Sequence, residues 1–163
     1  MSIFEPSEIF QFAIRIEENG EKFYRQMAQK LKDETVKELF SALADEEVKH
    51  RKTYEGLVSK IEKYEPFEAF PGEYFDYLRA YADDHIFTAE VLKKEMKKIN
   101  DATAALQFAI QRELDSILYY QEIKSLVPKN QREIIDRIID EERRHYMKLT
   151  GCKPTGKAAC VQK

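Results

Sequence analysis

The stretch DEEVKH at residues 45–50 recurs as DEERRH at residues 140–145, an offset of 95. A second match, QFAI at 11–14 and again at 107–110, has an offset of 96. Both motifs occur in the same order in each half of the chain, so the sequence predicts two similar halves. Each half also contains one Glu-x-x-His motif.

Apolar residues recur every three or four positions through four long segments, which is the period of an amphipathic helix. A short turn at Lys32 and Asp33 separates the first two segments, with Asp33 as the cap of the second helix. Pro128 separates the last two, and Asn130 with Glu133 is expected to form a capping box. We therefore predict two helical hairpins, with helices at about 7–31, 34–63, 101–126 and 130–149.

The segment 64–100 connects the two hairpins and opens with EPFEAFPGE, whose prolines and glycine interrupt any helix. Two short helices are expected within it, near 73–83 and 88–98. The fold class predicted is an all-α four-helix bundle of two similar hairpins joined by one long crossover. Aromatic residues of the crossover are expected to pack on the bundle or to form a dimer interface: Phe67, Phe70, Tyr74, Phe75, Tyr77 and Tyr81.

Length and charge limit the classes of protein. The 163 residues suit one domain, at about 1–150, followed by a tail at 151–163. The net charge is −3 with both signs interleaved, which disfavours nucleic acid and anionic membranes as partners. The acidic N-terminus does not resemble a secretory signal, so we expect a cytoplasmic protein. Cys152 and Cys160 lack CxxC spacing and are predicted to be reduced thiols.

Carboxylates and imidazoles interrupt the apolar faces of the predicted helices. The second and fourth helices each carry a Glu and a His there, and the first and third each carry a Glu. At about 1.5 Å rise per residue, the two glutamates of each hairpin lie at nearly the same level. Four buried carboxylates need compensating charge, which two divalent cations would supply. The candidate metal ligands are Glu17, Glu47, His50, Glu113, Glu142 and His145.

This set resembles the dimetal pattern of the ferritin-like superfamily, and within it the rubrerythrin-like branch that lacks a rubredoxin domain. The resemblance covers about residues 7–149. It implies that the six residues bind two iron ions, with Glu47 and Glu142 bridging; manganese and zinc are alternatives. It also implies oxidation of ferrous iron by dioxygen or hydrogen peroxide.

The chain departs from rubrerythrins in two respects. It has no CxxC pairs for a rubredoxin iron, so electrons would come from an external donor. Three residues after Glu113, where rubrerythrins carry an additional carboxylate, it has Ser116. These two departures argue against peroxidase activity of the rubrerythrin type.

Other polar residues lie close to the predicted ligands. Tyr24 and Tyr120 each follow a ligand glutamate by seven residues, so each phenol would either hydrogen-bond a ligand or lie in the apolar core. Glu46 and Glu141 point about 100° away from the ligands around their helices, which favours solvent exposure or contact with a ligand over coordination. His85 is interpreted as a solvated residue of the crossover.

The sequence therefore supports three hypotheses about function. The first is a diiron-carboxylate oxidoreductase, acting in oxidative stress or iron handling as a homodimer. The second is a protein that buffers iron or manganese without turnover. The third is a structural helical dimer with a vestigial site.

Overall fold

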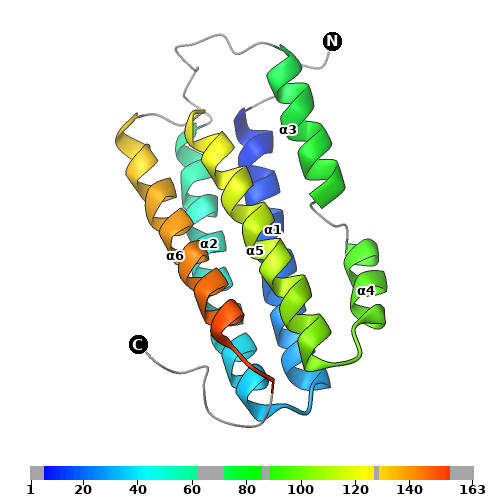
Figure 1. Cartoon of the computed structure of the whole chain (residues 1–163). Helices are drawn as coiled ribbons and strands as arrows, with labels where there is room; N and C mark the ends of the chain where they lie inside the picture. Colours follow the sequence, from blue (N-terminus) through cyan, green and yellow to red (C-terminus); the bar gives the residue numbers. More distant parts are fainter. Residues whose placement is uncertain (1–5, 62–71, 86–88, 127–128, 155–163) are drawn as a thin grey trace.

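The computed structural model describes residues 6–61, 72–85, 89–126 and 129–154. Its four long helices run side by side as a bundle (Figure 1). The first hairpin comprises α1 (Pro6–Lys30) and α2 (Glu34–Ile61), and the second comprises α5 (Ala102–Lys124) and α6 (Arg132–Gly151). Two short helices, α3 (Gly72–His85) and α4 (Ala89–Lys98), belong to the crossover. The predicted all-α bundle of two hairpins with short helices between them is confirmed.

Short polar side chains set where the long helices begin. Asp33 accepts a hydrogen bond from the backbone N–H of Val36 at 3.1 Å, as its predicted role as a cap requires. Asp101 caps α5 in the same way, accepting from the N–H of Ala104 at 2.8 Å. The start of α6 differs from the prediction, because a 3-10 turn at Lys129–Gln131 precedes it and the α-helix begins only at Arg132.

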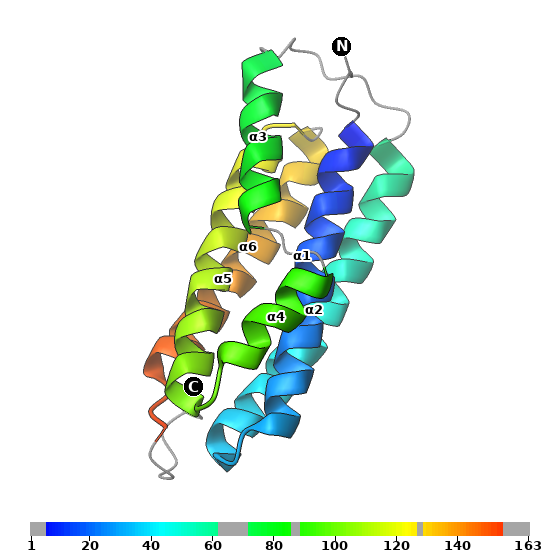
Figure 2. The same cartoon turned by 90° about the vertical axis from the view of Figure 1, so that its right-hand side faces the viewer.

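The crossover covers one side of the bundle. In the view of Figure 2, α3 and α4 follow one another along the bundle, α3 packing against α5 and α4 against α1. Tyr74 and Tyr81 pack against the apolar core, and the Tyr81 hydroxyl donates to the Asp115 carbonyl at 2.8 Å. Intrachain packing therefore accounts for these two aromatic residues. Phe67 and Phe70 lie outside the described residues, and the predicted dimer stays a prediction.

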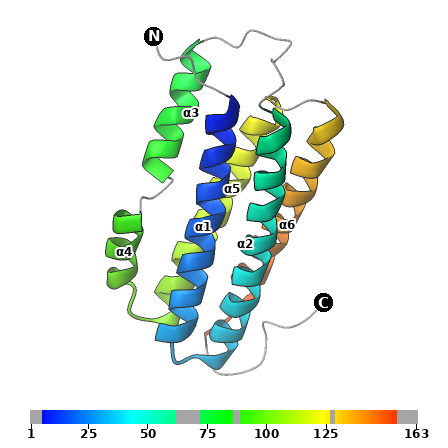
Figure 3. The same cartoon turned by 180° about the vertical axis from the view of Figure 1, so that it is seen from behind.

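The core consists of two apolar clusters with a polar layer between them. One cluster includes Phe10, Tyr54 and Ile135, and the other includes Phe40, Leu43 and Leu149. Figure 3 shows the opposite side of the bundle, where α2 lies between α1 and α6. The predicted Glu and His residues fill the layer between the clusters, so they lie about halfway along the four long helices.

Two further features concern the predicted tail and the membrane. Cys152 is 6% exposed and forms a disulfide, so the prediction of a reduced thiol is wrong for this residue. Sequence spacing failed here because a disulfide depends on proximity after folding. The chain's other cysteine, Cys160, lies outside the described residues. Among the described helices, none has a stretch of apolar residues sufficient to cross a membrane.

Candidate metal centre

The structure brings all six predicted ligands together in the interior of the bundle. Each of the four long helices contributes at least one, and none of the six residues is more than 4% exposed. Burying so many ionisable groups in an apolar core is costly unless they are paired or bind cations. The cluster is therefore a specific feature of this sequence and not a consequence of helix packing.

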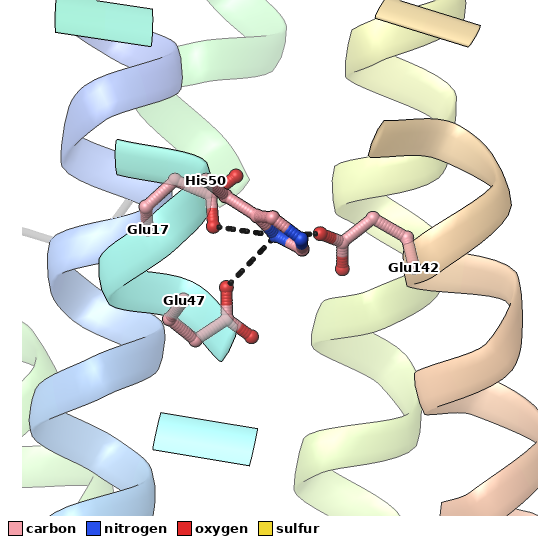
Figure 4. A group of neighbouring side chains, drawn as sticks. All are labelled: Glu17, Glu47, His50 and Glu142. Atoms are coloured by element: carbon pink, nitrogen blue, oxygen red, sulfur yellow. Dashed lines mark ion pairs between the residues drawn. The ribbon is translucent and has the colours of Figure 1, made fainter. Parts of the chain in front are cut away.

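The six residues form two groups that share two members. Glu17, Glu47, His50 and Glu142 make the first group. Glu113 and His145 join the same Glu47 and Glu142 to make the second. Within each group, one ligand atom from every residue lies within 4.8 Å of the others. Figure 4 shows the first group, with side chains from different helices directed at one another. The two shared carboxylates lie between the two groups, where a bridging ligand would lie.

Each histidine presents Nδ1 to three carboxylates. His50 Nδ1 lies 2.8 Å from Glu142 Oε1 and 3.4 Å from Glu17 Oε2. His145 Nδ1 lies 3.5 Å from Glu142 Oε2 and 3.6 Å from Glu113 Oε2.

Several of these buried atoms have no hydrogen-bond partner among the described residues: Glu17 Oε2, Glu142 Oε1 and both Nδ1 atoms. Groups of this kind are normally hydrogen-bonded inside proteins. Because they converge on one another instead, the donor set fits cations placed between them.

The other nitrogen of each histidine is held by the opposite hairpin. His50 Nε2 on α2 lies 2.6 Å from Glu141 on α6, and His145 Nε2 on α6 lies 2.5 Å from Glu46 on α2. Lys148 also contacts Glu46, at 3.0 Å. A carboxylate that accepts the Nε2–H fixes the ring and leaves the Nδ1 lone pair for a metal. The sequence had allowed this contact or solvent exposure for the two glutamates, and it could not name the histidine that each contacts.

The two tyrosines also connect the hairpins. Tyr24 on α1 donates a hydrogen bond to Glu113 on α5, and Tyr120 on α5 donates to Glu17 on α1. Both tyrosines are at most 2% exposed. Contact with a ligand and placement in the core were alternatives in the sequence; in the structure both apply to each tyrosine.

The comparisons with known proteins agree with this geometry. The family described as Rubrerythrin matches residues 8–152. The chain belongs to the rubrerythrin family. A solved structure from Thermotoga maritima, described as that of a ferritin-like diiron-carboxylate protein, is 30% identical to it with a TM-score of 0.62. The match covers 92% of this chain and 95% of that one. No curated protein matches the chain.

Burial and mutual contact divide the four glutamates of this rubrerythrin-family site into two pairs. Burial raises the pKa of Glu17 and Glu113 well above the ordinary value, and neighbouring carboxylates raise it further. Burial also acts to raise the pKa of Glu47 and Glu142, but close polar contacts with neighbouring acids and imidazoles outweigh it and lower both pKa values. The second pair is therefore the more readily ionised.

Burial and the neighbouring carboxylates have opposite effects on the pKa values of the two histidines. Burial lowers the pKa of His50 and His145, but the surrounding carboxylates outweigh burial and raise both pKa values. The Glu142 carboxylate has the largest such effect on His50, and Glu113 on His145. Without metal, protons thus neutralise the cluster, and cations that bind there must displace them.

A pocket leads to the centre between α1 and α5. It reaches the ligands Glu47 and Glu113 and has a volume of about 50 Å³. Gly20 and Ser116, each three residues after a ligand glutamate, line it, and apolar atoms form most of its wall. The Ser116 hydroxyl donates to the Arg112 carbonyl at 2.9 Å, so it is directed at the backbone.

Proposed function

We propose that this protein is a diiron-carboxylate oxidoreductase that oxidises Fe(II) with dioxygen or hydrogen peroxide. One observation carries the proposal: two buried donor groups, each with one imidazole and three carboxylates, share Glu47 and Glu142. The relative from Thermotoga maritima, described as a diiron-carboxylate protein, supports the same assignment.

The donor chemistry is suitable for iron. Four carboxylates and two neutral imidazoles balance the charge of two divalent cations, and carboxylate-rich sites with imidazole suit iron or manganese. Glu17 with His50 would hold one ion, and Glu113 with His145 the other. The shared Glu47 and Glu142 would bridge them.

The residues around the donor set would keep it in place during the reaction. Glu141 and Glu46 hold the two imidazoles, and Tyr24 and Tyr120 each fix one oxygen of a terminal carboxylate. When bound, ferrous ions would supply the electrons that reduce the oxidant. The chain's own part is to orient the ligands, exclude bulk water and hold protons near the reacting atoms.

The size of the pocket supports a small oxidant. A buried water needs roughly 10–15 Å³ of cavity volume. The pocket, at about 50 Å³, therefore accommodates a few molecules of that size. Dioxygen and hydrogen peroxide are both small enough. Glu47 and Glu113 belong to the donor groups and line the pocket, so a molecule inside it would lie beside the donor groups.

The experiment that tests the proposal combines metal analysis with anaerobic loading. Protein loaded with Fe(II) should contain about two ions per chain. Oxidant should then produce the near-ultraviolet absorption of a ferric pair. The variant Glu47→Gln/Glu142→Gln should lose at least one ion. The matched control Glu55→Gln/Glu133→Gln changes exposed residues on the same two helices, and it should bind iron normally.

The outcomes separate the three hypotheses. Oxidant consumption with two bound ions supports the oxidoreductase. Stoichiometric binding without oxidant consumption would indicate a buffering protein instead. Absence of iron binding in the unmodified protein would refute both and leave a structural bundle.

A further inference from the structure

A continuous row of tyrosine rings connects the metal centre with the surface of α3. Tyr120, which hydrogen-bonds the ligand Glu17, is in edge contact with Tyr119 at a centroid distance of 6.3 Å. Tyr119 stacks on Tyr81 at 6.1 Å, and Tyr81 is 6.3 Å from Tyr77. All these separations lie within the range of interacting aromatic pairs. Tyr77 is 44% exposed, so the row ends in solvent.

The internal repeat shows that this row is not required by the fold. With the offset of 96, Tyr24 corresponds to Tyr120, and Phe23 corresponds to Tyr119. Tyr24 likewise hydrogen-bonds a ligand glutamate, but the rings in contact with it are Phe23 and Phe40. Phenylalanine is much harder to oxidise than tyrosine. Among these ring contacts, only the tyrosine of the second half, Tyr120, therefore has a readily oxidised ring beside it.

We propose that Tyr77, Tyr81, Tyr119 and Tyr120 pass electrons, one at a time, from an external one-electron donor to the metal centre. The proposal rests on the proposed function, and it specifies dioxygen as the oxidant that needs this route. Reducing dioxygen to two waters takes four electrons and four protons. Two ferrous ions that become ferric supply two electrons, so two more must come from outside. Hydrogen peroxide takes only two electrons, which the ferrous ions alone can supply.

Each transfer balances charge within the row. Tyr120 gives up one electron to the centre while its phenol proton moves along the hydrogen bond towards Glu17. Tyr119 then reduces Tyr120, which recovers its proton from Glu17. Tyr119 and Tyr81 keep their own phenol protons while each passes one electron inwards, and the electron reaches them from Tyr77. The four protons that form two waters come from solvent. The exposed Tyr77 loses its proton to water and regains an electron and a proton from the donor side. Two such passages deliver the two missing electrons.

The crossover makes the route possible. Tyr81 and Tyr77 lie on α3, which packs against α5, the helix that carries Tyr119 and Tyr120. The hydroxyl of Tyr81 donates to the Asp115 carbonyl of α5 at 2.8 Å, which fixes the ring against Tyr119.

The test locates the oxidised tyrosine directly. Fe(II)-loaded protein is mixed with dioxygen and a nitrone spin trap without any donor, and mass spectrometry then identifies the trapped residue. Unmodified protein should carry the adduct on Tyr77. Tyr119→Phe and Tyr81→Phe keep the rings and remove only a hydroxyl, and both should lose the adduct on Tyr77. Tyr119→Phe is expected to fold, since Phe23 occupies the equivalent position in the first half.

Tyr54→Phe is the matched control. The Tyr54 ring also contacts Tyr120, at 5.1 Å, but its other aromatic contact is Phe10, so it lies off the row. This variant should keep the adduct on Tyr77. The relay is refuted if dioxygen is consumed and Tyr77 carries no adduct, or carries the same amount in all three variants.

A metal-free measurement separates failure of the relay from failure of the proposed function. A soluble ruthenium(III) oxidant, generated by a light flash, is too large for the interior and should oxidise Tyr120 through Tyr77. The oxidation product at Tyr120 should appear in unmodified protein and in Tyr54→Phe, and should be lost in Tyr81→Phe. Equal oxidation of Tyr120 in Tyr81→Phe refutes the relay. If loaded protein consumes no oxidant but this result holds, the row conducts and the proposed oxidase function is wrong.

Discussion

Replacing Gly20 by Ala tests how closely α1 must approach the shared carboxylate Glu47. A methyl group at this position would lie 3.2 Å from Glu47 Cδ and 3.4 Å from its Oε1. The distance to Cδ is shorter than ordinary van der Waals contact, so the Glu47 carboxylate would shift by a few tenths of an ångström. Because Glu47 belongs to both donor groups, both metal positions would be affected.

Two effects of this substitution oppose each other. Ala stabilises a helix interior over Gly by about 0.5–1 kcal/mol, whereas the displaced Glu47 costs packing and ligand geometry. Gly56→Ala on α2 is the matched control, since a methyl there meets no atom within 4 Å and only the first effect remains. Metal-free Gly20→Ala should therefore gain less stability than the control. Its metal affinity should fall about tenfold, or ~1.4 kcal/mol, as for other residues that support ligands.

Urea unfolding of the metal-free proteins and competitive titration with a divalent metal give the two quantities. Both variants are compared with unmodified protein at the same pH, because metal binding competes with protons. If Gly20→Ala binds metal as tightly as Gly56→Ala does, the close approach of α1 to Glu47 does not control the centre, and our account of the site is wrong.

Three further predictions follow from the electrostatics of the centre. Metal binding should release at least the two protons held by the imidazoles. Titration calorimetry in buffers of different ionisation enthalpy should show this proton release as a binding heat that depends on the buffer. An equal binding heat in every buffer would contradict the prediction. The hydrogen bond with His145 lowers the pKa of Glu46 to about 2. The stability that the ionised Glu46 contributes should therefore be present above about pH 4.5 and be lost as the pH falls towards 2. Urea unfolding of metal-free Glu46→Gln beside unmodified protein should show a difference that shrinks over this range, whereas a constant difference would exclude this linkage. Tyr24→Phe should weaken metal binding by about 10–100-fold through loss of its hydrogen bond to Glu113, and unchanged affinity would show that the phenol is dispensable.

Much of the bundle could be predicted from local patterns. The 3.6-residue period and the predicted cap Asp33 located the long helices to within a few residues. The same period located the inward glutamates and histidines, and the positions of the turns gave the heights of the glutamates along each hairpin. These features depend on one helix or one hairpin, where sequence distance converts directly into geometry. The predicted start of α6 was less accurate, because a 3-10 turn and the first turn of an α-helix have similar residue preferences.

Contacts between the hairpins could not be predicted in the same way. Glu46 holds the histidine of α6 and Glu141 the histidine of α2, and these pairs are 99 and 91 residues apart. Whether such residues meet depends on how each helix is rotated about its axis and how the hairpins pack.

The sequence by itself determined that the chain repeats, that it forms two helical hairpins, and that six ionisable side chains face inward, with the two glutamates of each hairpin at nearly the same level. Periodicity and the cost of burying charge are sufficient for these conclusions. Only the tertiary structure decided which histidine Glu46 and Glu141 each contact, that Gly20 and Ser116 line a pocket beside Glu47 and Glu113, and that Tyr119 meets Tyr81 of the crossover. Each of these depends on side chains from different hairpins or from the crossover, whose relative placement is fixed by packing in three dimensions.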